Sequence, residues 1–496
     1  MMRTVSISDL MARSGVAFGT SGARGLVTAM TDEVCFAYTC AFLQHLGNIG
    51  QFAPGMRVAI AGDLRPSTPR IIKACASAIT HMGGVVNYCG FVPSPAVALH
   101  GFAQAIPSLM VTGSHIPDDR NGIKFNRVDG EVLKPDELKM RAQQVELPDL
   151  FDGGGALREA VAELPLVNVA ADYVARYVDF FGREALRGLT LGIYEHSAVG
   201  RDLLVDIVEA LGAKAVRLGR SDTFIPVDTE AVRPEDLALA RDWADRLGID
   251  AILSTDGDSD RPLLADETGA WMRGDVLGIL CARMLGIEAV ATPVSSNSAL
   301  ELTNAFAKVR RTRIGSPFVI EAMNDLIGSV STACGYEANG GFILGSDVVM
   351  AGRVLAALPT RDAVLPMVAV LVEVQRTGTP ISALQTQLPA RFTFSDRIKG
   401  FSTSRSQDLL ADLQAGADDD VLKRLTHYFG NLAGEALTYD LTDGLRIVFV
   451  DGDIIHLRPS GNAPELRCYT ESASPERAAH INSEILALVK GKGPLL

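Results

Sequence analysis

One short loop of the sequence carries three alternating aspartates, Asp256, Asp258 and Asp260. Carboxylates this close together repel one another unless a cation lies among them, and hard oxygen ligands suit Mg²⁺ or Ca²⁺. An EF-hand calcium loop shows the same alternation, but it needs glycine where Arg261 stands, and the flanking segments here predict strands. We therefore expect a Mg²⁺ site, with a solvated acidic loop as the alternative. Arg261 is placed to hold a phosphate oxygen or a charged transition state.

A second loop offers a nucleophile. Residues 107–111 form an apolar run that predicts a buried strand, and the polar stretch after it holds Ser114 and His115, with Lys124 further on. Ligands collect at the carboxyl ends of strands in open α/β sheets. A serine needs a base, a strong field or a bound group before it can react. An ordinary polar turn is the alternative, because Gly-Ser and Pro-Asp are common turn sequences.

Two further loops combine glycine with cationic and hydroxyl side chains. Segment 18–25 places three glycines around hydroxyl groups and Arg24, which allows a phosphate to approach the backbone closely. Segment 458–467 suits a phosphate dianion through backbone N–H groups, small polar side chains and guanidinium forks. A flexible loop and a solvated surface turn are the respective alternatives. The candidates in the second segment are Arg458, Ser460, Gly461, Asn462 and Arg467.

One more glycine-rich loop, residues 335–341, carries Glu337 and Asn339. A carboxylate and an amide in such a loop could hydrogen-bond the hydroxyl groups of a sugar. A tight turn without a ligand is the alternative.

Strands and helices that could hold these loops recur along the chain. Residues 56–62, 70–82 and 85–88 predict a strand, a helix and a strand, and similar orders recur over 189–254 and 276–326. Each of these three repeats is followed by one loop: the first by the loop of Ser114, the second by the loop of the three aspartates and the third by the loop of Glu337. The final segment differs, with alternating strands over 445–470 and a helix over 474–490. We predict three related α/β domains with mixed sheets in series, followed by an α+β domain.

The length of 496 residues is too great for one hydrophobic core, so several domains are expected. The predicted domains are 1–154 with the loop of Ser114 (the serine loop) and 155–265 with the loop of the three aspartates (the acidic loop). They are followed by 266–385 with loop 335–341 (the sugar loop) and 386–496 with loop 458–467 (the phosphate loop).

Composition narrows the class of protein. The net charge of −13 argues against a nucleic-acid or acidic-membrane partner. Seven scattered cysteines without a C-x-x-C pattern predict reduced, buried thiols in a cytoplasmic protein. Neither a signal peptide nor an apolar run long enough to span a membrane is apparent.

Taken in order, four of these loops resemble those of the α-D-phosphohexomutases, and the resemblance runs from residues 19–25 to residues 458–461, which is nearly the whole chain. Residues 112–117 are similar to the T-[AG]-S-H-N-P serine loop of that family, and residues 256–261 to its D-G-D-G-D-R metal loop. Residues 335–341 are similar to its G-E-x-S-G-H sugar loop, and residues 458–461 are similar to its phosphate loop.

The resemblance implies four domains around a central cleft and a phosphoserine at Ser114. It implies Mg²⁺ held by the three aspartates and the Ser114 phosphate, with the serine and acidic loops facing each other. Arg24, His115, Lys124 and Arg261 become candidates for acid–base and phosphate-stabilising roles. Glu337 and Asn339 would read the sugar, and the loop from Arg458 to Arg467 would hold the phosphate that does not react.

Several positions depart from the family pattern. Ile116 and Ser259 replace an asparagine and a glycine, and Asn339 and Gly341 replace a serine and a histidine of the sugar loop. Segment 315–317 lacks the cationic residue or histidine often found after its glycine, and Asn462-Ala463 replaces Thr-Glu in the phosphate loop. The residues expected to transfer phosphate are present, so we expect activity, whereas the departures bear on the choice of sugar.

The leading functional hypothesis is a Mg²⁺-dependent isomerase that interconverts hexose 1-phosphate and hexose 6-phosphate through a hexose 1,6-bisphosphate. Mannose is the first choice of sugar and glucose a possible second. Action on glucosamine phosphate is the alternative within the family, and a non-catalytic sugar-phosphate or cation-binding relative is the alternative outside it. We expect a monomer or homodimer whose partner is a small phosphosugar.

Overall fold

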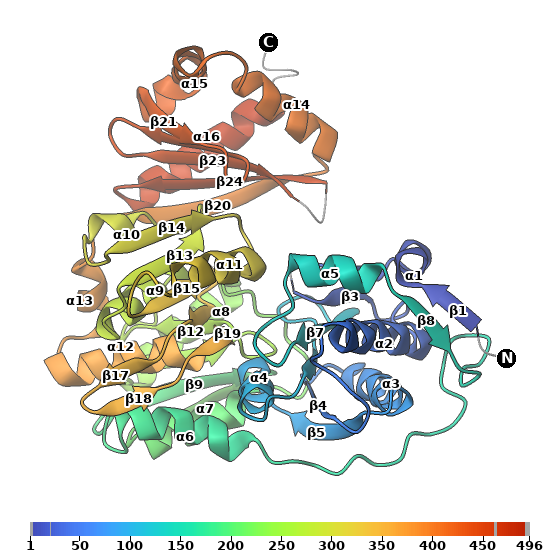
Figure 1. Ribbon diagram of the computed structural model, residues 1–496. Helices are drawn as coiled ribbons and strands as arrows, with labels where there is room; N and C mark the ends of the chain where they lie inside the picture. The colour runs from blue at the N-terminus through green and yellow to red at the C-terminus, as the bar shows by residue number, and fades with distance from the viewer. Residues whose placement is uncertain (1–2, 20, 461–463, 492–496) are drawn as a thin grey trace.

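The computed structural model describes residues 3–19, 21–460 and 464–491, and the chain forms four units in sequence order. The first lies to the right in Figure 1, the second and third to the left, and the fourth at the top. The first three units are α/β with mixed sheets and the last is α+β, so the predicted fold class is confirmed.

The first unit carries a six-stranded mixed sheet. Its elements are β1 (Arg3–Ser6), α1 (Ile7–Ser14), β2 (Ala17–Phe18), β3 (Ala23–Leu26), α2 (Asp32–Asn48), β4 (Arg57–Gly62), α3 (Thr68–His81), β5 (Val85–Phe91), α4 (Ser94–Ala103), β6 (Ser108–Val111), β7 (Arg120–Asn126), α5 (Lys134–Arg141) and β8 (Gln144–Leu147). The strand order is β2-β3-β7-β6-β4-β5, and β1 pairs separately with β8. Strand β4 is parallel to β5 and β6, whereas β7 runs antiparallel to β6.

The second unit repeats the centre of that sheet. Its elements are α6 (Ala170–Phe181), β9 (Thr190–His196), α7 (Arg201–Ala210), β10 (Lys214–Arg220), α8 (Pro234–Leu247), β11 (Ala251–Thr255) and β12 (Pro262–Ala265). The order is β10-β9-β11-β12, with β9 parallel to both neighbours and β12 antiparallel to β11.

The third unit repeats it again. Its elements are α9 (Gly274–Met284), β13 (Ala289–Pro293), α10 (Ala299–Leu302), β14 (Lys308–Thr312), α11 (Ser316–Leu326), β15 (Ala333–Tyr336), β16 (Phe342–Leu344), β17 (Val348–Met350), β18 (Arg353–Leu355), β19 (Leu358–Asp362), α12 (Val364–Thr377) and α13 (Ile381–Thr386). The order is β14-β13-β15-β16-β19, with β15 parallel to β13 and β16 antiparallel to β15.

The three units therefore share one strand pattern, in which a parallel trio is followed by an antiparallel fourth strand. The serine loop joins β6 to β7, the acidic loop joins β11 to β12, and the sugar loop joins β15 to β16. Each loop thus leaves the carboxyl end of the third strand, where open α/β sheets collect ligands. This equivalence explains why one sequence pattern recurs three times.

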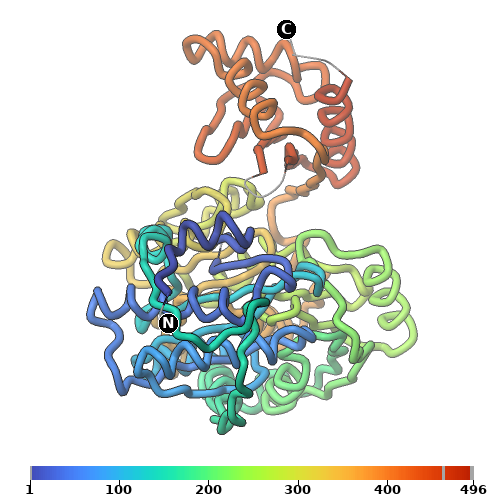
Figure 2. The backbone as a smooth tube through the Cα atoms, turned by 90° about the vertical axis from the view of Figure 1, so that its right-hand side faces the viewer, coloured from blue at the N-terminus to red at the C-terminus, as the bar shows by residue number. Residues whose placement is uncertain are grey.

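The fourth unit stands apart from the others in both views (Figures 1 and 2). Its elements are β20 (Phe392–Lys399), α14 (Thr403–Leu413), α15 (Asp418–Ala433), β21 (Ala436–Asp440), β22 (Leu445–Phe449), β23 (Ile454–Pro459), β24 (Glu465–Ser472) and α16 (Pro475–Gly491). The antiparallel order is β20-β24-β23-β22-β21. This unit has its own hydrophobic cluster, whereas one cluster runs through parts of the other three.

All seven cysteines are buried and unpaired, as the sequence predicts. Within the described ranges, none of the helices combines the length and the apolar character needed to cross a membrane.

Candidate active site

The loop between β11 and β12 brings its three aspartates to one point. One carboxylate oxygen from each of Asp256, Asp258 and Asp260 lies within 4.8 Å of the others, and all three residues are buried. Asp258 Oδ1 and Asp260 Oδ1 are buried with no hydrogen-bond partner among the described residues. Unpaired buried carboxylate oxygens are costly unless a cation neutralises them. The set therefore fits Mg²⁺, which prefers oxygen ligands.

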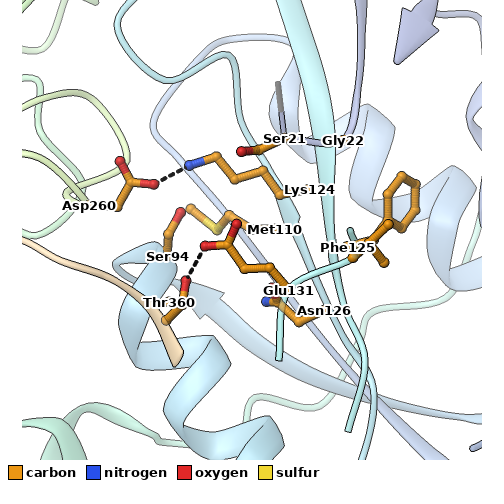
Figure 3. Close-up of a pocket in the computed structure, with 11 residues that line it drawn as sticks. Ser21, Gly22, Ser94, Met110, Lys124, Phe125, Asn126, Glu131, Asp260 and Thr360 are labelled. Carbon is orange, nitrogen blue, oxygen red and sulfur yellow. Dashed lines mark hydrogen bonds and ion pairs between the residues drawn. The ribbon is translucent and has the colours of Figure 1, made fainter. Parts of the chain in front are cut away.

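The charges of this cluster are unevenly compensated. Lys124 donates hydrogen bonds to Asp258 and Asp260, the second of which is visible in Figure 3. Burial would raise the pKa of Asp258, but Lys124 and the Ser94 hydroxyl, which donates to Asp258 Oδ2 at 2.6 Å, hold it below its usual value. Burial and the two neighbouring carboxylates raise the pKa of Asp256 well above its usual value. A cation placed among the three would relieve that repulsion.

Ser114 faces this cluster from the first unit. Its hydroxyl donates a hydrogen bond to Asp256 Oδ2 at 2.7 Å, so the serine and acidic loops meet at the junction of the first two units. The backbone N–H of Ser114 donates to Thr112 Oγ1 at 2.7 Å, and its φ of 56° is left-handed. Such a conformation costs free energy in a residue other than glycine and persists only where the surroundings impose it.

Ser259 adopts the same backbone region in the acidic loop, with a φ of 58°. It stands where the family pattern has glycine, which would accept this conformation without strain. The serine side chain gives two contacts in return: its Oγ accepts hydrogen bonds from Thr255 Oγ1 at 2.8 Å and from the backbone N–H of Gly200 at 2.9 Å. These bonds offset the backbone cost, so the departure is compatible with an intact metal loop.

Arg65 imposes the shape of the serine loop, and sequence reasoning gave it no role. Arg65 is 1% exposed, and Asp63 Oδ2 accepts from its Nε at 3.0 Å. A Cβ added to Gly113 would lie 2.5 Å from Arg65 Cζ, so glycine is needed there. The guanidinium donates to four backbone carbonyls of the loop, those of Ser114, Ile116, Pro117 and Arg120.

His115 lies among cations. Arg261 Nη1 donates to His115 Nδ1 at 3.0 Å, which leaves the proton of the neutral ring on Nε2. Burial, followed by the charges of Arg261 and Arg24, lowers the pKa of His115 to about 2, so the ring is neutral at physiological pH. Burial and Arg261 also lower the pKa of Arg24, to about 10. Together these guanidinium groups give the site a concentrated positive charge suited to phosphate.

The sugar loop reaches the same place from the third unit. Arg361, in β19, donates to Glu337 Oε2 at 3.4 Å and forms an ion pair with Asp260 Oδ2 at 2.9 Å. Asn339 is used within its own loop, where its Oδ1 accepts from the backbone N–H of Gly341 at 2.9 Å. Glu337 therefore lies near the acidic cluster, whereas the Asn339 amide oxygen is occupied by the backbone.

The pocket beside Lys124 and Asp260 also joins the first unit to the third (Figure 3). Buried Glu131 accepts hydrogen bonds from Thr360 Oγ1 at 2.8 Å and from Ser316 Oγ at 3.3 Å. Ser316 Oγ in turn lies 3.1 Å from Ser21 Oγ of the first glycine loop. These contacts, and those of Arg65 and Arg361, were not predicted from the sequence because none of these residues belongs to a recognisable motif.

The predicted phosphate loop lies in the fourth unit, between β23 and β24. Arg458 and Arg467 pair across these strands, and Arg458 Nε donates to Asp443 Oδ2 at 2.8 Å. Ser460 is buried at the start of the loop, and the backbone N–H of Ser460 donates to the Glu465 carbonyl at 2.8 Å. The predicted residues Gly461 and Asn462 lie outside the described ranges.

Comparison with known proteins agrees with this architecture. Models of four phosphoglucomutase/phosphomannomutase domains match the chain: alpha/beta/alpha domain I over residues 15–146, domain II over 171–269, domain III over 273–392 and the C-terminal domain over 405–488.

Two curated relatives match over nearly their full length. A phosphomannomutase of Salmonella muenchen is 45% identical over 485 residues, covering 98% of each chain. A phosphomannomutase of Sinorhizobium fredii is 43% identical over 477 residues, covering 96% of this chain and 99% of the relative. A phosphoglucosamine mutase of Anaeromyxobacter dehalogenans is more distant, at 31% identity over 74% of this chain and 81% of the relative.

The same fold occurs in a solved structure of a phosphoglucomutase/phosphomannomutase family protein from Burkholderia thailandensis. The TM-score is 0.71 at 20% identity, with 95% of this chain and 97% of that chain covered. The chain therefore belongs to the phosphoglucomutase/phosphomannomutase family of α-D-phosphohexomutases, which are isomerases.

Proposed function

We propose that this isomerase interconverts mannose 1-phosphate and mannose 6-phosphate through a phosphoserine at Ser114. The observation that carries the proposal is the contact of Ser114 with the acidic cluster, where its Oγ lies 2.7 Å from Asp256 Oδ2. A phosphate on that oxygen would lie beside the three aspartates. Mannose is chosen because the two phosphomannomutases named above resemble nearly the whole chain.

In the forward reaction, the phosphorus–oxygen bond to Ser114 Oγ breaks and a bond to the free 6-hydroxyl of mannose 1-phosphate forms. The sugar hydroxyl loses its proton as that bond forms and the freed Ser114 Oγ takes up one proton, so the products are mannose 1,6-bisphosphate and a free serine hydroxyl. The bisphosphate then turns around and returns its 1-phosphate to Ser114 Oγ. The two transfers balance, because the enzyme regains one phosphoryl group and the sugar keeps one.

Different residues near Ser114 are proposed for charge compensation, proton transfer and metal binding. Arg24 and Arg261 compensate the negative charge of the phosphoryl group, which is most of what phosphoryl transfer requires. Lys124 and His115 are the candidates for moving the hydroxyl proton. Asp256, Asp258, Asp260 and the phosphate on Ser114 would hold Mg²⁺, which neutralises charge on the transferred group when bound.

Binding of the sugar falls to two other loops. Glu337 and Asn339 would read the hydroxyl groups of the ring, and the fourth unit would hold the phosphate that does not react. In the fourth unit, the residues proposed to hold this phosphate are Arg458, Ser460, Gly461, Asn462 and Arg467.

The test is ³¹P NMR of the purified protein with Mg²⁺ and a trace of hexose 1,6-bisphosphate. Mannose, glucose and glucosamine 1-phosphates are offered in turn, and we expect mannose 6-phosphate to form fastest. Fastest conversion of glucosamine 1-phosphate would support the alternative within the family. Lack of conversion of all three by folded protein would contradict the proposal and favour a binding role.

The Ser114→Ala variant tests the phosphoserine directly. It should fold and should lose turnover as well as the phosphate label that the bisphosphate places on the wild type. The matched control is Ser67→Ala, which removes a hydroxyl from the neighbouring loop, where Ser67 Oγ accepts from Asn121 Nδ2 at 2.8 Å. Full activity of Ser114→Ala would exclude the mechanism.

A further inference from the structure

Arg361 is a buried cation to which the chemistry above assigns no role. It is the fourth residue of β19 and is 3% exposed. Its Nη2 lies 2.9 Å from Asp260 Oδ2 and donates to Ser21 Oγ at 3.5 Å, and its Nη1 donates to Glu337 Oε2 at 3.4 Å. One side chain thus contacts the first glycine loop, the acidic loop and the sugar loop.

Gly341 makes room for this side chain. A Cβ added there would lie 2.6 Å from Arg361 Cδ and 2.9 Å from Arg361 Cγ, which are closer than real contacts allow. The backbone of Gly341 lies outside the left-handed region, so its conformation does not itself demand glycine. The stem of Arg361 is therefore the main reason why a side chain is excluded at position 341, where the family pattern has histidine.

The charges around Arg361 keep it ionised. Burial would lower its pKa, but Asp260, Glu131 and Glu337 raise the pKa above its ordinary value. A buried guanidinium is costly unless carboxylates pair with it in good geometry. Because Asp260 and Glu337 come from different loops, this pairing also fixes the distance between those loops.

We propose that Arg361 is a positioning residue for the hexose phosphate. Its fork holds the Glu337 carboxylate of the sugar loop in register with Asp260 of the acidic loop. The sugar hydroxyl groups are then read at a fixed distance from the phosphoryl group that moves. Gly341 is the matching small residue that admits the arginine stem. This inference rests on the proposed function, in which Glu337 contacts the sugar.

The first test compares Arg361→Gln and Arg361→Lys with the wild type. We expect Arg361→Gln to raise KM for mannose 1-phosphate by about 10- to 100-fold, the range typical of a lost charged hydrogen bond. Arg361→Lys keeps the charge without the fork and should recover only part of that loss. Mn²⁺ binding, followed by electron paramagnetic resonance on the metal alone, should be as tight as in the wild type or tighter, because a cation beside Asp260 has been removed.

A purely structural role would give a different result. Arg361→Gln would then weaken Mn²⁺ binding and lower the melting temperature while KM of the remaining active enzyme stayed unchanged, and this outcome would overturn the inference. A wild type that converts none of the sugar phosphates would instead overturn the proposed function, and this inference with it.

A double-mutant cycle tests the pairing of Arg361 with Gly341. Gly341→Ala should raise KM about tenfold in the wild-type background, because its Cβ displaces the arginine stem. In the Arg361→Ala background that stem is absent, and adding Gly341→Ala should change KM less than about twofold. Equal effects of Gly341→Ala in both backgrounds would show that the two residues act independently.

Discussion

Lys124 and Asp260 form an ion pair between the first and second units, and Lys124 also pairs with Asp258. Lys124, a candidate for proton transfer, therefore forms ion pairs with two of the three carboxylates that are expected to hold Mg²⁺. Burial would lower the pKa of Lys124, but Asp258 and Asp260 raise it overall, so the side chain carries a full charge. The ammonium is bonded to the Oδ2 atoms of carboxylates whose Oδ1 atoms are unpartnered in the described residues, so a metal ion on Asp258 and Asp260 would compete with Lys124 for the charge of the same carboxylates.

Replacing Lys124 with methionine should separate these two roles. Turnover should fall by at least about 100-fold if Lys124 moves a proton in the reaction. Mn²⁺ should bind about threefold to tenfold more tightly, because the competing ammonium has gone. Steady-state kinetics and Mn²⁺ titration measure the two effects. The control is Lys73→Met, which changes an exposed lysine of α3. Weaker metal binding in Lys124→Met would contradict the competition.

Asp258→Asn removes one expected metal ligand. The Mg²⁺ concentration for half-maximal activity should rise by about 10- to 100-fold, and turnover should fall with it, because the amide carries no charge for the cation. A Mg²⁺ titration of activity measures both effects. Asp245→Asn on the exposed side of α8 is the control of equal chemistry. An unchanged Mg²⁺ titration would remove Asp258 from the metal site.

The sequence located the loops better than it located the residues that hold them in place. Each of the three repeated loops follows a short apolar strand, so composition alone marks where a ligand could lie. Arg65 and Arg361 act through contacts with Ser114 and Asp260, which lie 49 and 101 residues away in the chain. Such contacts depend on how the units pack, and a single sequence does not display that packing.

Some elements also lacked a readable pattern. Helix α2 is buried on almost every side, so its residues show no alternation between apolar and polar faces. Helix α15 does show an amphipathic pattern, with buried residues such as Val421, Leu425 and Phe429 spaced by four, yet the sequence reading placed no helix there. Helix α2 was not predicted because burial on nearly all sides removes the amphipathic pattern, whereas the pattern of helix α15 was present in the sequence and was overlooked.

Arg467 offers a test of the fourth unit. Its Nε is buried without a hydrogen-bond partner among the residues that the structure describes, so it is available to an anionic ligand. Arg467→Gln should raise KM for the sugar phosphate by about 10- to 100-fold and change kcat less, because the phosphate it holds does not react. Steady-state kinetics with mannose 1-phosphate gives both constants. The control is Arg477→Gln, whose guanidinium pairs with Asp451 and Asp453. A fall in kcat with an unchanged KM would place Arg467 in the chemical step instead.

His196 links stability to pH at the base of the acidic loop. Its Nε2 donates to the Thr255 carbonyl at 2.8 Å, and its Nδ1 is buried without a partner in the described part of the chain. Burial lowers the pKa of His196 from 6.5 to about 4, so between those values the unfolded chain binds a proton that the folded chain does not. The stability that His196 contributes is therefore complete above pH 6.5 and is lost as pH falls toward 4, by up to about 1.4 kcal/mol per pH unit.

Thermal unfolding followed from pH 7 to pH 4 should show a smaller loss of stability in His196→Gln than in the wild type. The exposed His427→Gln variant is the control and should follow the wild type, whereas parallel pH curves for wild type and His196→Gln would show that this histidine does not set the acid limit.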